Sequence, residues 1–298
     1  MNNLIFTNPA IGSIDLITDD YVRLTALTGV SAIADINTQA TAGRNGATVG
    51  LMSVPQRQII VEFRIRKGVD AEQAMHDMYR IFSAMSSGTM VFKGRLGSSK
   101  IDYIVKSIEI PPNAEELRGN VVLICPDPFF RAVTDERAPI AGLNSMFQFP
   151  YLFPDHGFYI AKRMESLFAD VYNDGEANTG MMIQFIATAQ VVNPALINVA
   201  TNEEARLNFT MAAGDIVRIY TETGEKKITL TRDGVTTNIF GNMHYPFTFL
   251  QLAQGNNTFK YDADEGAGNM NILVMFSAKF GALYTNAPNA IDPRGWND

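Results

Sequence analysis

The sequence has little of the chemistry from which enzyme sites, disulfide frameworks and membrane anchors are built. It contains one cysteine, one tryptophan and three histidines in 298 residues. A single cysteine excludes an internal disulfide and any zinc site that needs several thiolates. No run of 18 apolar residues occurs, so we expect no membrane insertion. The first ten residues, MNNLIFTNPA, lack the basic and apolar segments of a secretory signal, so we expect synthesis in a reducing cytosol.

Positive charge is also scarce. The formal net charge is -7, and only 18% of the residues are charged. Proteins that bind nucleic acid are usually basic, so this composition disfavours that class of partner. Hydrophobic residues make up 46% of the chain, which is typical of packed globular domains and excludes a disordered chain. The length favours two domains over one.

One short stretch marks the predicted division between the two domains. Residues 121–125 form an apolar run that ends in the only cysteine, as in a buried strand. Pro126 and Pro128 end this strand, because proline has no N–H group to donate to a sheet and restricts the residue before it. Phe129 and Phe130 follow at once, and we expect this aromatic pair to pack against the next domain.

The first half, residues 1–131, is predicted to be an α+β domain with one helix. Residues 57–66 alternate apolar with mostly charged side chains, which is typical of a half-buried antiparallel strand. Asp70 can cap an amphipathic helix over Glu72–Met85. Residues 37–50 are expected to form a long loop, in which Asn45-Gly46 signals a tight turn. Further strands are expected in residues 4–36 and at Thr89–Phe92, Ile101–Ile110 and Asn120–Cys125.

The second half changes to a β pattern throughout. We expect a connector at 132–172, a β-sandwich at 173–284, and a polar tail at 285–298 that holds Trp296. Turn signals at spacings of roughly 8–12 residues are typical of a sandwich. The candidate strands are Met181–Val191, Ala195–Asn198, Ala205–Phe209, Ile216–Thr221, Lys227–Thr231, Thr236–Phe240, Phe247–Leu250, Thr258–Tyr261 and Ile272–Phe280.

Candidate residues for chemistry are few and dispersed. His76, His156 and His244 lie in three separate segments, with no spacing that suits a metal ion or a catalytic triad. Cys125 is expected to be a small core residue, because nothing near it in sequence would lower its pKa. Residues 262–266 hint at calcium but lack the glycine and distal glutamate of an EF-hand loop, so we expect a polar turn. We therefore predict no catalytic residue, no cofactor and no metal ion.

Several segments in a fixed order together resemble one protein family. These segments are Val122–Phe130, Asn173–Ala177, Met182-Ile183, Asn193-Pro194, Gly214–Thr221 and Phe249–Thr258. Over residues 55–280 the chain is similar to the distal tail proteins (Dit), the siphovirus-type tail components of phages with long non-contractile tails. It departs from the simplest members in its long connector at 132–172 and in the tail after Tyr284.

The resemblance implies a structural virion protein of the tail tip, or baseplate, and no enzyme. By this resemblance a split-barrel-like α+β domain builds a hexameric ring with a central channel, and a galectin-like β-sandwich projects outward. The ring joins the tail tube protein to the tail-associated tip protein, and in some phages it holds receptor-binding proteins. We expect assembly in the host cytoplasm, no membrane insertion, and no contact with nucleic acid beyond the channel.

Two other classes of function stay open on the sequence. A sandwich can be a carbohydrate-binding module for host cell-wall sugars, although no tryptophan precedes Trp296 to stack on a sugar ring. The chain can also be a cell-wall hydrolase, since a pair of carboxylates dispersed in the sequence leaves no motif.

Overall fold

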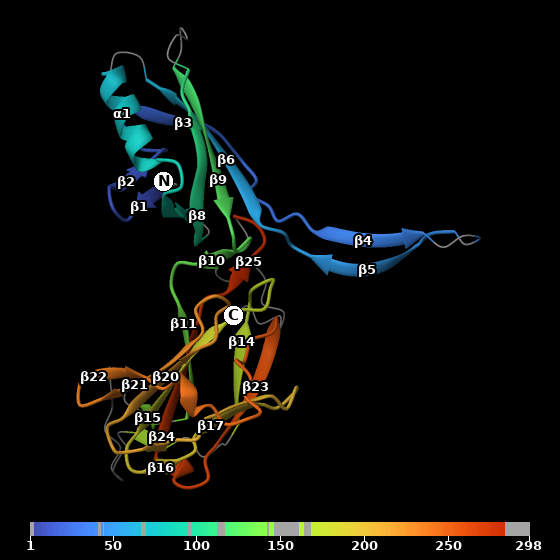
Figure 1. The fold of residues 1–298 in the computed structure, drawn as a ribbon, viewed down its shortest axis with the longest axis vertical. Coiled ribbons are helices and arrows are strands. Elements are labelled where there is room, and N and C mark those ends of the chain that lie inside the picture. The colour runs from blue at the N-terminus through green and yellow to red at the C-terminus, as the bar shows by residue number, and fades with distance from the viewer. Residues whose placement is uncertain are drawn as a thin grey trace, which may run out of the picture. The chain divides into compact units, whose positions relative to one another are not determined.

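The structure is a computed structural model that describes residues 3–40, 43, 45–66, 70–94, 97–111, 117–141, 143–145, 161–163 and 168–283. For residues 143–145 and 161–163 only the backbone is described. The chain divides into two compact units (Figure 1). Unit 1 comprises residues 1–133 together with 279–298, and unit 2 comprises residues 134–278.

Unit 1 is built on an open antiparallel sheet with one helix on one of its faces (Figure 1). The main path of the sheet is β2 (Gly12–Asp15), β1 (Asn3–Asn8), β7 (Ser87–Lys93), β8 (Ser98–Glu109), β9 (Arg118–Cys125), β6 (Arg57–Ile65) and β3 (Val22–Thr28). Beside it, β10 (Phe130–Ala132) pairs with both β8 and β25 (Lys279–Phe280). A separate pair, β4 (Asp35–Ala40) and β5 (Ala47–Ser53), forms a two-stranded hairpin.

The core of unit 1 follows from the alternation of its strands. Every second residue of β6 is buried, and Ile59, Val61 and Phe63 face the helix α1 (Ala71–Ile81) with the apolar residues of β9. The side chain of Asp70 accepts a hydrogen bond from the backbone N–H of Gln73 (3.1 Å), which caps the helix as predicted. The predicted helix is confirmed, but it ends at Ile81 rather than Met85.

Unit 2 is a sandwich of two antiparallel sheets. The larger sheet has the order β11 (Glu136–Ala141), β24 (Met270–Phe276), β15 (Met181–Ala187), β20 (Ile216–Tyr220), β21 (Lys227–Arg232) and β22 (Val235–Asn238). The smaller sheet has the order β14 (Phe168–Asn173), β23 (Gly255–Asp262), β17 (Ala195–Asn198) and β18 (Glu204–Arg206). Short pairs and turns complete the described elements: β12 (Leu143–Ser145) with β13 (Ala161–Arg163), β16 (Val191–Val192) with β19 (Thr210–Met211), η1 (Phe240–Asn242) and η2 (Ala267–Asn269).

One hydrophobic core joins the two sheets of unit 2. Ile183, Phe185 and Val217 from the larger sheet belong to the same buried cluster as Leu196 and Phe259 from the smaller one. The strands alternate buried and half-exposed residues, so each sheet presents one face to this core and one face away from it. The mainly β fold with one helix in the first half is therefore confirmed.

The strand boundaries differ from the expected ones in several places. The expected loop at 37–50 contains most of the β4–β5 hairpin, and Phe247–Leu250 forms no strand. Strands β11 and β14 lie inside the expected connector at 132–172 and pair in the sheets of unit 2. Strand β25 lies inside the expected sandwich but pairs with β10 in unit 1. The expected tail at 285–298, with Trp296, lies outside the described residues.

Candidate assembly interface

The β4–β5 hairpin is the most exposed element that the structure describes. All thirteen of its strand residues, six in β4 and seven in β5, are exposed. It extends from the sheet of unit 1 as a separate arm (Figure 1). An isolated two-stranded hairpin is at best marginally stable in water, because neither of its faces is covered. The arm therefore has the properties of an element that completes its packing on another molecule.

The two faces of the arm differ in chemistry. Ile36 lies opposite Met52 and Thr38 lies opposite Val49, so these side chains project from one face. The alternate residues of β4 are Asp35, Asn37 and Gln39, which make the other face polar on this strand, whereas Leu51 of β5 is a further exposed apolar residue. Ile36 is 50% exposed, Val49 55% and Met52 68%. The arm therefore has an unpartnered apolar face and a polar face.

The root of the arm is fixed by glycine and by hydrogen bonds within unit 1. Gly29 has a φ of +79°, and an added Cβ would lie 2.0 Å from the carbonyl oxygen of Gln58. Only glycine therefore allows β3 to leave the sheet so close to β6. The Ala32 N–H donates to the carbonyl of Gly281 (2.7 Å), and the Leu283 N–H donates to that of Val30 (3.1 Å). Residues 281–283, which are distant in sequence, thus hold the segment that leads into the arm.

A buried arginine supports the same region. Arg57 is 6% exposed, donates to the carbonyl of Gly281 (2.7 Å), and lies over the ring of Phe130 (4.7 Å to its centroid). Burial lowers the pKa of Arg57 from its ordinary value. Phe130 is fully buried in unit 1, whereas its predicted companion Phe129 is only half-buried. Cys125 is also fully buried, and burial raises its thiol pKa to about 12, so it is a core residue as predicted.

A small ion-pair network lies at the exit of β9. Asp127 accepts a hydrogen bond from Arg131 (2.9 Å) and lies 3.1 Å from the Nζ atom of Lys279 in β25. Burial alone would raise the pKa of Asp127, but the hydrogen bond from Arg131 and the charge of Lys279 hold it below its ordinary value. The carboxylate therefore stays ionised and links β10 to β25, which completes the edge of unit 1.

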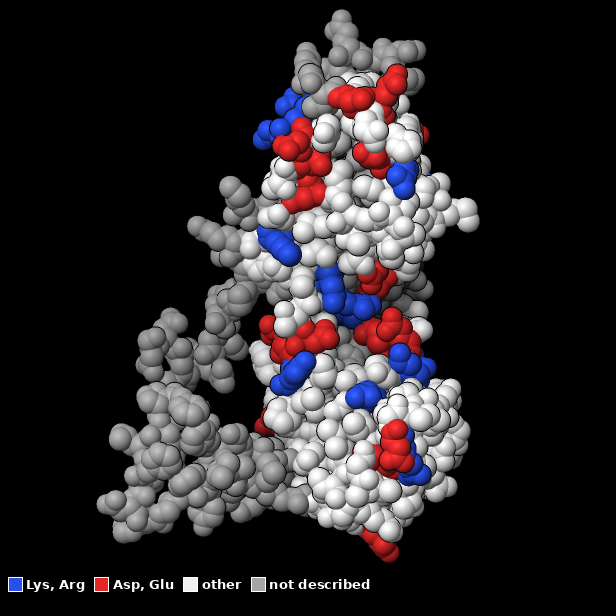
Figure 2. Space-filling model, turned by 90° about the vertical axis from the view of Figure 1, so that its left-hand side faces the viewer, with Lys and Arg blue, Asp and Glu red and all other residues white. Residues whose placement is uncertain are grey.

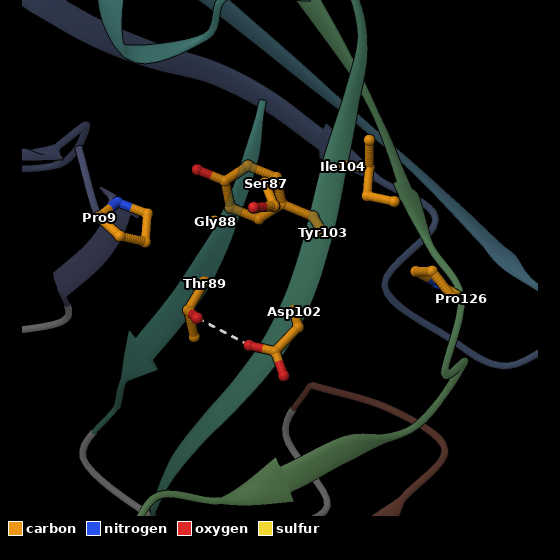
Figure 3. Close-up of a pocket in the computed structure, with 8 residues that line it drawn as sticks. All are labelled: Pro9, Ser87, Gly88, Thr89, Asp102, Tyr103, Ile104 and Pro126. Carbon is orange, nitrogen blue, oxygen red and sulfur yellow. Dashed lines mark hydrogen bonds between the residues drawn. The ribbon is translucent and has the colours of Figure 1, made fainter. Parts of the chain in front are cut away.

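One shallow pocket of unit 1 lies between β7 and β8 (Figure 3). Its lining includes Gly88, Tyr103 and Pro126, and the hydroxyl of Thr89 donates to the carboxylate of Asp102 (2.7 Å). Tyr103 is 2% exposed, and its hydroxyl has no hydrogen-bond partner among the described residues. Burial raises the pKa of Tyr103, so the hydroxyl stays protonated. This pocket therefore contains a single carboxylate, and its lining includes no histidine or cysteine.

The histidines considered as candidates for metal or catalytic chemistry lie in separate parts of the chain. His76 is exposed on α1 beside Asp77, His244 is exposed on the loop after η1, and His156 lies outside the described residues. Among the described residues, no group of three or more His, Cys, Asp or Glu could hold a metal ion. None of the described helices is long and apolar enough to cross a membrane.

The acidic stretch at 262–266 has a structural role. Arg206 of β18 donates to Asp262 (2.8 Å) and to Asp264 (3.3 Å), and Asn193 donates to Asp264 (2.6 Å). The hydrogen bond from Arg206 lowers the pKa of Asp262. These carboxylates are thus paired with an arginine of β18 that reaches across β17 to the end of β23.

Charged side chains are dispersed over the surface. Figure 2 shows one face on which basic and acidic groups alternate in small clusters and leave wide uncharged areas. That face has no continuous basic surface of the kind that tracks a phosphate backbone.

Comparison with known proteins gives a family match for residues 174–280 and a similar fold for most of the chain. Residues 174–280 match the family model described as "Siphovirus-type tail component, C-terminal domain". The structure is similar to the crystal structure of Dit of phage SPP1, described as a paradigm of the hub adsorption apparatus in phages that infect Gram-positive bacteria. The TM-score is 0.67 at 11% identity, over 93% of this chain and 99% of that one.

Two baseplate structures agree with this result. Both are structures of the phage p2 baseplate in its activated conformation. The one with Ca has a TM-score of 0.55 to this chain at 10% identity, and the one with Sr has a TM-score of 0.55 at 11% identity. Each match covers 94% of this chain and 98% of the other. At these identities the likeness shows the fold alone. No curated protein sequence matches the chain.

Proposed function

We propose that this chain is a Dit-type structural hub of a phage tail tip; the tail-component domain matched at 174–280 and the likeness of the chain's fold to Dit support this. In this proposal unit 1 forms a hexameric ring at the end of the tail tube, and the ring connects the tube protein to the tip protein. Receptor-binding proteins attach to the same hub. The protein acts in the virion, is assembled in the host cytoplasm, and catalyses no reaction.

The observation that carries the ring is the apolar face of the β4–β5 arm. The arm is anchored at its root by Gly29 and by the hydrogen bond from Ala32, so it is presented to solvent in a defined direction. Covering its apolar face removes Ile36, Val49 and Met52 from water, and full burial of such a side chain is favourable by about 1.5–3 kcal/mol. In a ring, a second copy of the chain covers this face, because the arm of each subunit packs on the next subunit.

The ends of the sheet give less support to the ring than the arm does. The main path of the sheet of unit 1 ends at β2 on one side and at β3 on the other. The Leu24 N–H of β3 donates to the carbonyl of Leu16, directly after β2 (2.9 Å), so the two ends meet there. The arm is therefore the element of unit 1 on which the proposed contact between identical subunits rests.

The experiment compares two double variants of the arm. Val49→Asp with Met52→Asp adds two charges to the apolar face, and Gln39→Asp with Thr48→Asp adds the same charges to the polar face. We expect the apolar-face variant to weaken assembly by at least about tenfold, since it removes about 3–6 kcal/mol of burial for each arm. The polar-face variant should assemble as the unmodified protein does. Light scattering over a range of concentrations gives the mass, and thermal melting checks that both variants fold.

Equal assembly of the two variants would contradict the arm as the ring contact. Loss of assembly in both would instead indicate that added charge alone disrupts the ring.

A further inference from the structure

We propose that the face of the larger unit 2 sheet that points away from the core binds an acidic glycan. The outward face is defined here by the residues that alternate with the core residues on five neighbouring strands. These are Asn271, Leu273 and Met275 of β24, Met182, Gln184 and Ile186 of β15, Ile216, Arg218 and Tyr220 of β20, Lys227, Thr229 and Thr231 of β21, and Thr236 and Asn238 of β22.

These side chains are accessible. The residues of the outward face on β24, β15 and β20 are all half-exposed, whereas their neighbours on the same strands are buried in the core. Strand β22 is exposed throughout and forms the edge of the sheet. The outward face is therefore open to a ligand along the edge strand and the strands beside it.

A chain of hydrogen bonds runs across four strands of the outward face. Arg218 donates through Nε to the amide oxygen of Gln184 (2.8 Å) and through Nη1 to the hydroxyl of Thr231 (3.4 Å). The hydroxyls of Thr231 and Thr236 lie 2.9 Å apart. These hydrogen bonds hold the guanidinium between Gln184 of β15 and Thr231 of β21, so donors and acceptors lie on both sides of it. Such a row of amide, hydroxyl and guanidinium groups matches the donor and acceptor pattern of sugar hydroxyls.

An aromatic ring lies next to this row. Tyr220 is two residues from Arg218 on the same strand, and it pairs across the sheet with Met182 and Lys227. The Nζ atom of Lys227 lies 4.2 Å from the centroid of the Tyr220 ring. The half-exposed ring and the neighbouring methionine give an apolar platform for the C–H face of a sugar. Polar groups and an apolar platform side by side are what a pyranose ring requires.

The charge of the outward face indicates that the glycan is acidic. Arg218 and Lys227 are its charged residues, both cationic, and the residues named in its definition include no Asp or Glu. No ion pair joins either cation to a carboxylate within the described part of the chain. Arg137 on the adjacent β11, opposite Met275, adds a third exposed cation. A phosphate or carboxylate group on the glycan supplies the missing negative charge.

The test is calorimetric titration of the full-length protein with three probes. A phosphomannan oligosaccharide carries phosphate on its sugar rings, oligogalacturonate carries carboxylate, and a neutral dextran oligosaccharide carries neither. We expect at least one acidic probe to bind at least about tenfold more tightly than dextran, and its binding to weaken as salt screens the charge. The acidic probe that binds identifies the acidic group. Binding of neither acidic probe at millimolar concentration, or equal binding of dextran, would overturn the proposal.

Variants separate this site from general attraction to positive charge. Arg218→Gln, Lys227→Gln and Tyr220→Ala should each weaken binding of the acidic probe by at least about tenfold. Arg80→Gln removes one exposed cation from α1 in unit 1 and should leave the binding unchanged. Lys227→Gln alters an exposed side chain and should leave the fold intact. It therefore tests the site even if the other variants fail to fold. If all four variants bind alike, the outward face is not the site, whatever the state of ring assembly.

Discussion

A pair of carboxyl groups makes the stability of unit 2 depend on pH. Burial, the charge of Asp174 and a hydrogen bond to Asp174 raise the pKa of Glu136 to about 7. The native protein therefore binds more protons at this site than the unfolded chain between the ordinary glutamate pKa and pH 7. The free energy of unfolding then decreases as the pH rises through that range.

Replacement of Glu136 by glutamine should remove the loss of stability that its ionisation causes. We expect Glu136→Gln to raise the melting temperature at pH 8, where the native Glu136 is ionised beside Asp174, and to change it much less at pH 5. Glu225→Gln removes an exposed charge elsewhere in unit 2 and should show no such pH dependence. Thermal melting of both variants at the two pH values checks the prediction. A glutamine variant that melts lower than the unmodified protein at pH 8 would refute it.

The only cysteine gives a second residue-scale prediction. Cys125 is fully buried at the end of β9, and its raised thiol pKa keeps it protonated. Cys125→Ser places a hydroxyl in this apolar position, so we expect a loss of about 1–3 kcal/mol in the free energy of unfolding. The native thiol should react with a bulky disulfide reagent only after unfolding. Rapid reaction of the folded protein would show that the thiol is accessible.

At the scale of elements, the position of the arm depends on a backbone conformation. Gly29→Ala forces a Cβ against the carbonyl of Gln58 at a φ of +79°, and we expect it to cost more than about 1–3 kcal/mol of stability. Gly46 near the tip of the arm has a φ of +98°, but nothing lies within 4 Å of an added Cβ. Gly46→Ala is therefore the control, because it carries only the strain of the left-handed backbone, about 1–2 kcal/mol, without the clash. Chemical denaturation measures both, and equal losses would refute a specific role for Gly29.

Elements with strong periodicity could be predicted from the sequence. The strand expected at 57–66 is β6, and the strand expected at Asn120–Cys125 is β9, because both alternate buried and outward residues over many positions. The helix is amphipathic and has a side-chain cap at Asp70, so its existence and its start were predictable. Its last turn was not, because Phe82 and Met85 continue the apolar pattern although Met85 is 88% exposed with a φ of +67°.

The candidate interface was the least predictable element. The arm packs neither face within its own unit, so its strands carry threonine, asparagine, glutamine and glycine in place of a buried alternating face. Strand β11 contains Pro139, and β25 is only two residues long and pairs with a segment about 150 residues away. Local sequence carries no signal for such a pairing. The chain of hydrogen bonds from Gln184 through Arg218 to Thr236 could not be predicted either, because it depends on how four strands are aligned with one another.

At the scale of the whole molecule, the units differ in what they offer to partners. Unit 1 has the exposed arm, which suits contact between copies of the chain. Unit 2 closes its core between two sheets and leaves the outward face of the larger one accessible. We infer that assembly depends on unit 1 and recognition on unit 2.

The mass of the purified, unmodified protein tests the central claim most directly. Analytical ultracentrifugation over a wide range of concentrations, with negative-stain images of the same sample, gives the number of subunits and shows whether they form a ring. The proposal predicts a closed ring of six copies of the 32.8 kDa chain, with a central channel. A protein that remains monomeric at the highest concentration, or that forms open chains of indefinite length, would contradict a ring built through the arm.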